Sequence, residues 1–251
     1  MAICAALYTV VGYLTSFGLN FGGVAFWPAA FVPAIFAVLF GPWEGAIGAA
    51  IGIFIRDSIV NGQPLLSLAV GVPANFAAFF LMGYLAHKKF DTKKTIFSLV
   101  IGFGVILAGL ILPTAIFPNE FTGIVIGNTT LSVETVTIVF AILMIVSFAL
   151  FLGISKFLKD FRSFSIGSMI GMSIGALIIA FGVWGYSQLF YGKNQYFAGQ
   201  LTGPLASAVF VWTFVTEAPF VLLIVPPVVK AVRQAFPFLS KEKGSEKVPL
   251  T

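Results

Sequence analysis

Apolar stretches long enough to cross a lipid bilayer recur along this chain, and they constrain its fold more than any other feature. Each has about the length that a helix needs to span the ~30 Å hydrocarbon core. A water-soluble globule is excluded by composition, since 59% of the 251 residues are hydrophobic and only 9% are charged. The sequence predicts eight spans, at residues 2–19, 24–40, 45–60, 65–86, 95–117, 134–158, 166–190 and 205–229.

Basic residues are distributed unevenly between the two ends of these spans. Twelve of the fourteen Lys and Arg residues lie in three clusters after the fourth, sixth and eighth spans, and only Arg56 and Lys193 lie on the other side. Because short loops rich in Lys and Arg stay in the cytoplasm, this asymmetry places both termini there. The sequence therefore predicts an all-α transmembrane domain over residues 1–239, multi-pass in the plasma membrane, and a disordered cytoplasmic tail at 240–251.

Several classes of function are disfavoured by composition and spacing. The net charge of +5 follows the predicted topology, and no basic, aromatic-rich soluble module suggests a nucleic-acid partner. Cys4 has no second sulfur with which to form a disulfide or bind a metal, and the single histidine, His87, stands at a predicted cytoplasmic end. No P-loop is present for ATP hydrolysis. We therefore expect no enzyme activity, no catalytic residue, no metal and no cofactor.

Ionisable side chains within the spans are candidates for ligand binding, because charge in hydrocarbon is costly. Glu217, in the middle of the eighth span, could bind a polar group of a ligand or relay a proton, and a structural glutamic acid bonded to a neighbouring helix is an equal alternative. Asp57 could reach a ligand or Lys193 across the outer mouth. We expect Arg56 to extend to external headgroups, since adjacent helical residues point about 100° apart and do not pair.

Aromatic and amide side chains near the outer ends of the spans complete the candidate ligand site. The aromatic ones suit stacking against a flat heterocycle, although an interfacial aromatic belt explains them on its own. The amides could donate hydrogen bonds to a ligand or serve a structural role. Besides Asp57 and Glu217, the candidate substrate-binding residues are Trp27, Asn75, Tyr186, Gln188, Tyr191 and Asn194, around an outward-facing pocket near residues 20–27, 57–64 and 184–200.

Small residues at every fourth position mark helix faces where backbones can approach closely in lipid. Such pairs occur at Ala2 and Ala6 in the first span and at Gly45 and Ala49 in the third, and the seventh span repeats the pattern. Packing within the bundle would account for them. Docking of a partner membrane protein is the alternative, and it is most plausible on the first span.

Residues 33–52, which read PAIFAVLFGPWEGAIGAAIG and are followed by Arg56-Asp57, resemble the second and third helices of the substrate-binding S components of energy-coupling factor (ECF) transporters. That family often shows a Gly-Pro-x-x-Gly turn before a glycine-rich helix. Residues 2–6 are similar to the small-residue stripe of its first helix, and residues 216–230 to its closing helix. S components typically have six helices, so residues 95–158 would be an added pair.

The resemblance implies a prokaryotic membrane-embedded capture subunit of an ECF-type ABC importer, which binds a small water-soluble vitamin or related micronutrient. It also implies a membrane-embedded coupling subunit docked through Ala2, Ala6, Gly41 and Gly45. A cytoplasmic ATPase pair would act through that subunit and power delivery by toppling of the bundle. Two alternatives remain open. One is a proton-coupled secondary transporter that uses Glu217, and the other is a non-transporting scaffold or anchor subunit of an enzyme complex.

Overall fold

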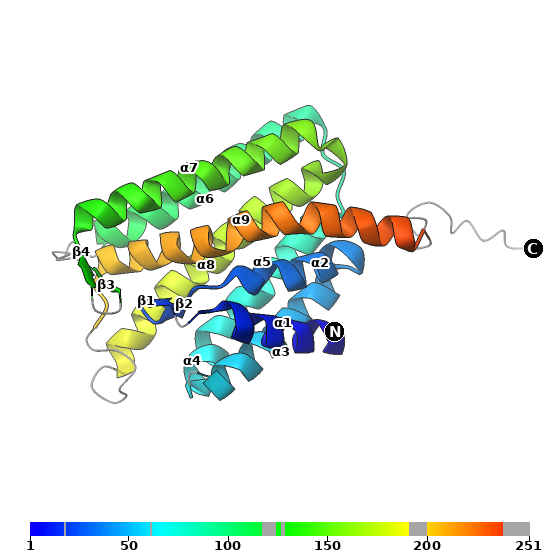
Figure 1. Ribbon diagram of the computed structural model, residues 1–251. Helices are drawn as coiled ribbons and strands as arrows, with labels where there is room; N and C mark the ends of the chain where they lie inside the picture. Colours follow the sequence, from blue (N-terminus) through cyan, green and yellow to red (C-terminus); the bar gives the residue numbers. More distant parts are fainter. Residues whose placement is uncertain (18, 61, 117–123, 127–128, 191–199, 238–251) are drawn as a thin grey trace, which may run out of the picture.

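The described part of the chain is an almost wholly helical bundle (Figure 1). The computed structural model describes residues 1–17, 19–60, 62–116, 124–126, 129–190 and 200–237. The α-helices are α1 (Ala2–Thr15), α2 (Phe31–Leu39), α3 (Pro42–Val60), α4 (Pro64–Leu66), α5 (Val72–Ala86), α6 (Thr92–Ile116), α7 (Val133–Phe157), α8 (Arg162–Phe190) and α9 (Gly203–Ala235). The other elements are the 3₁₀ turns η1 (Pro28–Ala30) and η3 (Lys159–Phe161), the π-helical turn η2 (Ser67–Gly71), and two antiparallel hairpins, β1 (Asn20–Phe21) with β2 (Val24–Ala25) and β3 (Ile124–Ile126) with β4 (Thr129–Leu131).

Five helical segments are long and apolar enough to cross a membrane, counted over the described residues. They are Pro64–Ala86, Thr92–Gly109, Thr137–Phe157, Lys159–Phe190 and Gly203–Ala235. The segments Ala2–Thr15 and Pro28–Leu39 are apolar but shorter, and the 19 residues of α3 include Glu44, Arg56 and Asp57. The fold is thus an all-α bundle suited to a membrane, as the sequence predicts. That all eight apolar stretches cross the bilayer stays a prediction.

Helices α1 to α3 and α5 to α9 alternate in direction between two ends of the bundle (Figure 1). One end, at the right in this view, holds the N-terminus, the α5–α6 and α7–α8 connections and the end of α9. The described Lys and Arg residues of the three clusters lie in these segments, and we call this the basic end. The opposite end, with α4 and both hairpins, is the hairpin end. The bundle therefore has the charge asymmetry from which cytoplasmic termini are predicted.

The connection between the first two apolar stretches differs from the prediction. The sequence favours helices over 2–19 and 24–40, but α1 ends at Thr15 and the chain becomes helical again only at η1. Gly22 and Gly23 have φ angles of 56° and 83°, and they form the two-residue turn between β1 and β2. Such a turn needs positive φ at both positions, which glycine adopts without steric cost. The hairpin brings residues 23–25 to the wall of a cavity.

A tight turn joins α2 and α3, between the predicted spans 24–40 and 45–60. The helix α2 ends at Leu39, Gly41 has a φ of 132°, and Pro42 is the first residue of α3. Proline suits this position because the first N–H groups of a helix have no partner within it. The helix α3 therefore starts three residues before the predicted limit of 45–60.

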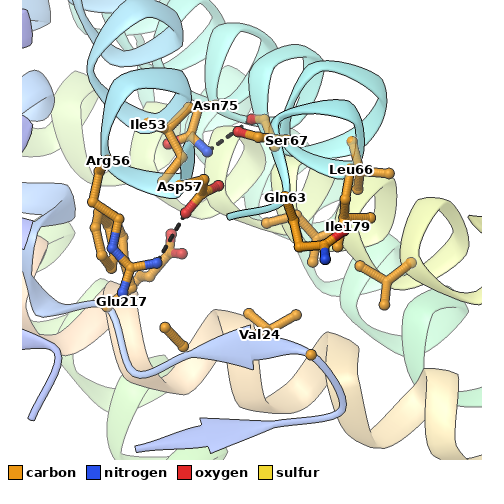
Figure 2. Close-up of a pocket in the computed structure, with 16 residues that line it drawn as sticks. Val24, Ile53, Arg56, Asp57, Gln63, Leu66, Ser67, Asn75, Ile179 and Glu217 are labelled. Atoms are coloured by element: carbon orange, nitrogen blue, oxygen red, sulfur yellow. Dashed lines mark hydrogen bonds and ion pairs between the residues drawn. The ribbon is translucent and has the colours of Figure 1, made fainter. Parts of the chain in front are cut away.

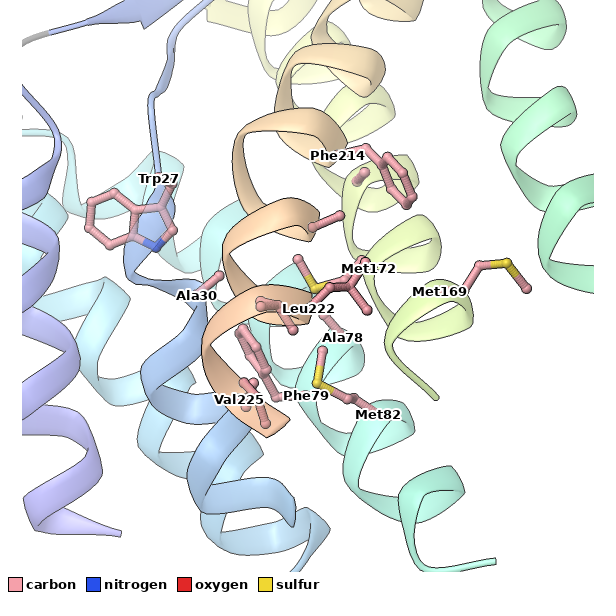
Figure 3. Close-up of a cluster of buried hydrophobic side chains, with 14 of the residues drawn as sticks. Trp27, Ala30, Ala78, Phe79, Met82, Met169, Met172, Phe214, Leu222 and Val225 are labelled. Carbon is pink, nitrogen blue, oxygen red and sulfur yellow. The ribbon is translucent and has the colours of Figure 1, made fainter. Parts of the chain in front are cut away.

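The core lies where α5, α8 and α9 pack together (Figure 3). Phe79 of α5, Met172 of α8 and Leu222 of α9 are at most 2% exposed. The interface between α5 and α8 is close enough that a methyl group at Gly171 would overlap the carbonyl oxygen of Ala78. In the seventh span, the small-residue spacing therefore serves packing within the bundle.

Candidate functional site: a charged cavity at the hairpin end

A cavity with an empty volume of about 610 Å³, its open mouth included, lies at the hairpin end between α3, η2, α5, α8 and α9. The β1–β2 hairpin covers one side of it, because the backbone carbonyl of Val24 accepts a hydrogen bond of 3.0 Å from the indole Nε1 of Trp212 on α9. Apolar side chains supply much of the wall, and polar groups converge from several elements. Among the residues that line the cavity are Val24, Trp27, Ile53, Arg56, Asp57, Gln63, Ser67, Asn75, Ile179 and Glu217.

Charged side chains are grouped on one side of this cavity (Figure 2). Arg56, Asp57 and Glu217 lie together, whereas Gln63 and Ile179 lie on the other side. The rest of the wall is mostly apolar, so each ionisable group is set in surroundings of low polarity, where its interactions are stronger than in water. The cavity can therefore select a ligand both by its shape and by its charge.

Arg56 and Asp57 form an ion pair, and the prediction that they do not pair is wrong. Arg56 Nη1 donates to Asp57 Oδ1 at 2.9 Å, and the two side chains are 4% and 16% exposed. The long arginine side chain folds back to its neighbour's carboxylate, which removes the 100° difference in direction between adjacent helical positions. The prediction that Arg56 extends to external headgroups is also wrong, because its guanidinium carbon lies 4.6 Å from the centre of the Trp27 ring.

The guanidinium keeps an unused donor. Within the described residues, Nε of Arg56 is buried and has no hydrogen-bond partner. A buried donor left unsatisfied costs about 1–3 kcal/mol. Since Arg56 lines the cavity, a ligand carrying an acceptor can supply this partner.

Trp27, which lies under Arg56, is held by a chain of hydrogen bonds. Trp27 Nε1 donates to the hydroxyl of Tyr8 at 2.6 Å, and this hydroxyl donates to Asn75 Oδ1 at 2.6 Å. Asn75 Nδ2 in turn donates to the backbone carbonyl of Gly71 at 2.9 Å. Tyr8 is fully buried, and its ring packs edge to face against that of Trp27, with 5.6 Å between the ring centres. This series of hydrogen bonds fixes the indole of Trp27 and links α1, the segment before α2, and α5.

Glu217 is the third charged group of the cavity. It lies on α9 two residues before Pro219, is half-buried, and makes no hydrogen bond or ion pair with any described residue. The bond to a neighbouring helix that a purely structural role would require is thus not found in the described part of the chain. Because Arg56 already pairs with Asp57, Glu217 is the carboxyl group of the cavity that has no ion-pair partner among the described residues.

The structure brings four of the eight predicted binding residues to one cavity, namely Trp27, Asp57, Asn75 and Glu217. Tyr186 and Gln188 lie elsewhere. Tyr186 is 7% exposed and belongs to an apolar cluster with the cavity-lining residues Leu66, Val70 and Val183. Its ring stacks on that of Phe190, with 4.4 Å between the ring centres. Gln188 donates to the backbone carbonyl of Leu201 at 2.9 Å, so it ties the end of α8 to the segment before α9. Tyr191 and Asn194, like Lys193, lie outside the described residues.

Several cavity residues are not identified by sequence reasoning. Ser67 and Gly71 belong to the π-helical turn η2, which ends two residues before Pro73. Proline has no N–H to donate to the preceding turn, so the regular i to i−4 pattern is interrupted there. Such wide turns are frequent at functional sites. A proline inside the fourth span was thus the signal that this turn could line a pocket.

The predicted docking residues fall into two groups. Ala2 and Ala6 are exposed on α1, on the side away from the bundle. Gly41 and Gly45 are buried, and a methyl group at Gly45 would overlap Ala37 of α2. The close approach at Gly45 is therefore made to α2 of the same chain. Docking of a partner at any of these positions stays a prediction.

Comparison with known proteins yields no relative: no family model, no curated protein and no solved structure matches this chain. The resemblance to S components accordingly stays a prediction from the motifs quoted above. The geometry of the cavity is the observation from which a function can be argued.

Proposed function

We propose that this chain is a membrane-embedded capture subunit that binds a small water-soluble nutrient in the cavity at the hairpin end. The carrying observation is the convergence of Arg56, Asp57 and Glu217 on a cavity of about 610 Å³ whose other walls are largely apolar. Ligand sites in proteins typically combine apolar walls with a few placed polar groups. The cavity also lies at the end opposite the basic clusters, which is the external end if Lys and Arg mark the cytoplasm.

The charges indicate the chemistry of the ligand. Glu217 lacks a described partner, so it suits a cationic group or a strong hydrogen-bond donor of the ligand. Nε of Arg56 lacks an acceptor, so the same ligand would place an oxygen or ring nitrogen there. The apolar side chains of Val24, Ile53 and Ile179 would contact a flat, less polar body. A vitamin or related heterocycle with a basic group combines these features.

The resemblance to S components supplies the finer proposal of an ECF-type importer in the plasma membrane. In that arrangement this chain only captures the ligand, a coupling subunit docks on it, and an ATPase pair supplies the energy. The exposed position of Ala2 and Ala6 on α1 supports docking at that helix, because both methyl groups remain accessible to a partner.

The experiment is to identify small molecules and proteins that copurify with the chain in mild detergent, by mass spectrometry, and then to measure the affinity for the compound found. Glu217→Gln should weaken binding about 30-fold or more, since truncating one partner of a buried charge pair costs about 2–5 kcal/mol. Glu134→Gln is the matched control, because Glu134 is exposed on α7 away from the cavity. A ligand-free chain bound to an unrelated enzyme would instead indicate the scaffold function.

A proton-coupled secondary transporter is the second candidate, and it is favoured by the same absence of a described partner for Glu217. The two functions differ in what Glu217→Gln does. In a capture subunit the variant loses ligand binding. In a proton-coupled transporter it binds ligand but no longer moves it, and the wild-type chain alone catalyses uptake into liposomes without any ATPase.

A further inference from the structure

A second hollow lies at the basic end, between the N-terminal part of α6 and the C-terminal part of α7, and we call it the α6–α7 crevice. Its empty volume is about 1,140 Å³, the open side included. Both helices pack on α8 and α9 rather than mainly on each other, which leaves the space between their ends unfilled. It is distinct from the cavity at the hairpin end, with which it shares no residue.

The walls of this crevice are apolar and face outward. Ile96 and Leu99 contribute from α6, and Leu152 contributes from α7. Ile96 is 59% and Leu152 is 43% exposed, so these side chains would meet lipid in a membrane. At Gly153, an added methyl group would find no atom within 4 Å. The surface of α7 at Gly153 therefore leaves open space for a hydrocarbon chain.

Two cations stand at one end of these apolar walls. Lys156 and Arg162 both line the crevice, and neither forms an ion pair with a carboxylate of the described residues, including the nearby Asp160. Arg162 Nε donates to the backbone carbonyl of Ser155 at 3.2 Å, which holds its position and leaves the two terminal nitrogens for another partner. The site therefore combines uncompensated positive charge with a hydrocarbon-lined space.

We propose that the α6–α7 crevice binds one anionic phospholipid, with an acyl chain along Ile96, Leu99 and Leu152 and the headgroup phosphate at Lys156 and Arg162. Lys156 Nζ lies 5.4 Å from the centre of the Phe157 ring, a contact that leaves its positive charge without a counter-ion. The charge complementarity selects an anionic occupant, because a zwitterionic lipid brings its own cation and would gain less from two basic groups that have no described ion-pair partner. Basic pockets between helices on the cytoplasmic side are a known means of holding such headgroups. The proposal does not depend on the nutrient cavity or its ligand.

The test is native mass spectrometry of the purified chain titrated with dioleoyl phosphatidylglycerol or dioleoyl phosphatidylcholine, which share acyl chains and differ in net charge. The wild type should retain one phosphatidylglycerol at least about 10-fold more tightly than phosphatidylcholine. The double variant Lys156→Gln/Arg162→Gln should lose most of this preference, since each basic group near a membrane surface contributes about 5-fold in binding. Lys89→Gln/Lys230→Gln is the charge-matched control at the same end of the bundle and should behave as the wild type.

A second variant tests the hydrocarbon half of the site. Gly153→Leu fills the open space and should weaken retention of phosphatidylglycerol while both cations remain. Equal retention of the two lipids by the wild type would overturn the proposal, as would equal losses in the charge variant and its control. If Gly153→Leu retains phosphatidylglycerol as tightly as the wild type does, the acyl chain of the lipid does not bind in the crevice.

Discussion

Removal of the Tyr8 hydroxyl, by Tyr8→Phe, tests the hydrogen-bond chain that holds Trp27 under Arg56. The substitution keeps the buried ring and deletes one oxygen, so its effect is confined to the bonds which that oxygen makes. Two are lost, the 2.6 Å bond from Trp27 Nε1 and the 2.6 Å bond to Asn75 Oδ1. Asn75 keeps its bond to Gly71, whereas the indole N–H loses its only acceptor among the described residues.

The magnitude follows from these two bonds. Hydrogen bonds between membrane helices contribute about 0.6 kcal/mol on average and up to about 1.7 kcal/mol. A buried donor left without a partner costs about 1–3 kcal/mol. Tyr8 is fully buried and Trp27 is only 4% exposed, so water cannot easily replace the hydroxyl. We expect Tyr8→Phe to lower the free energy of unfolding by about 1–3 kcal/mol, which is about 5- to 150-fold in the unfolding equilibrium constant.

The assay is reversible unfolding in mixed micelles, in which sodium dodecyl sulfate is titrated and helix content is followed by circular dichroism. Tyr13→Phe is the control, because Tyr13 lies on the same helix and is 62% exposed. It removes the same oxygen from an exposed position and should leave the free energy of unfolding unchanged. If the two variants agree within about 0.3 kcal/mol, the proposed hydrogen-bond chain does not stabilise the fold.

Two further predictions concern the packing and the sidedness of the bundle. Gly171→Ala and Gly185→Ala both raise the helix propensity of α8, but only the methyl group at position 171 would overlap a neighbouring backbone. Gly171→Ala should therefore have a free energy of unfolding about 1–3 kcal/mol lower than that of Gly185→Ala in the same assay. Equal stabilities would contradict the close contact between α5 and α8. In a Cys4→Ala background, Asn20→Cys should react with an impermeant maleimide added outside intact cells, and Lys89→Cys only after permeabilisation. Reaction of both from one side would refute the placement of the hairpin end and the basic end on opposite sides of the membrane.

Much of the helical fold can be predicted from the sequence, because each apolar run is long and bounded by glycine, proline or charge. The predicted spans 134–158 and 166–190 differ from α7 and α8 by only a few residues. One large difference is at α2, which starts seven residues after the predicted limit of 24–40 because the β1–β2 hairpin and η1 come first. Another arises where helix and hydrocarbon do not end together. The helix α9 continues to Ala235, six residues beyond the predicted span 205–229, because the charged residues that leave the hydrocarbon are still good helix formers.

The candidate site is less predictable, because the sequence shows which charges are buried but not which groups they meet. The cost of charge in hydrocarbon singles out Asp57 and Glu217, and both line the cavity. The pairing of Arg56 with its neighbour depends on one side-chain conformation, which no spacing rule determines. Tyr8 is overlooked because a single tyrosine in an apolar run gives no sign of a partner such as Asn75, 67 positions away.

The two features on which the proposed function depends meet at α1. One face of this 14-residue helix is buried and carries Tyr8, whose hydroxyl belongs to the chain that fixes Trp27 beside the cavity. Ala2 and Ala6 lie on an exposed face of the same helix. Since so short a helix moves as one rigid unit, a partner docked on the exposed face and a ligand in the cavity would act on the same element from different sides. Tyr8→Phe separates these actions, because it removes the link to Trp27 and leaves both alanines in place.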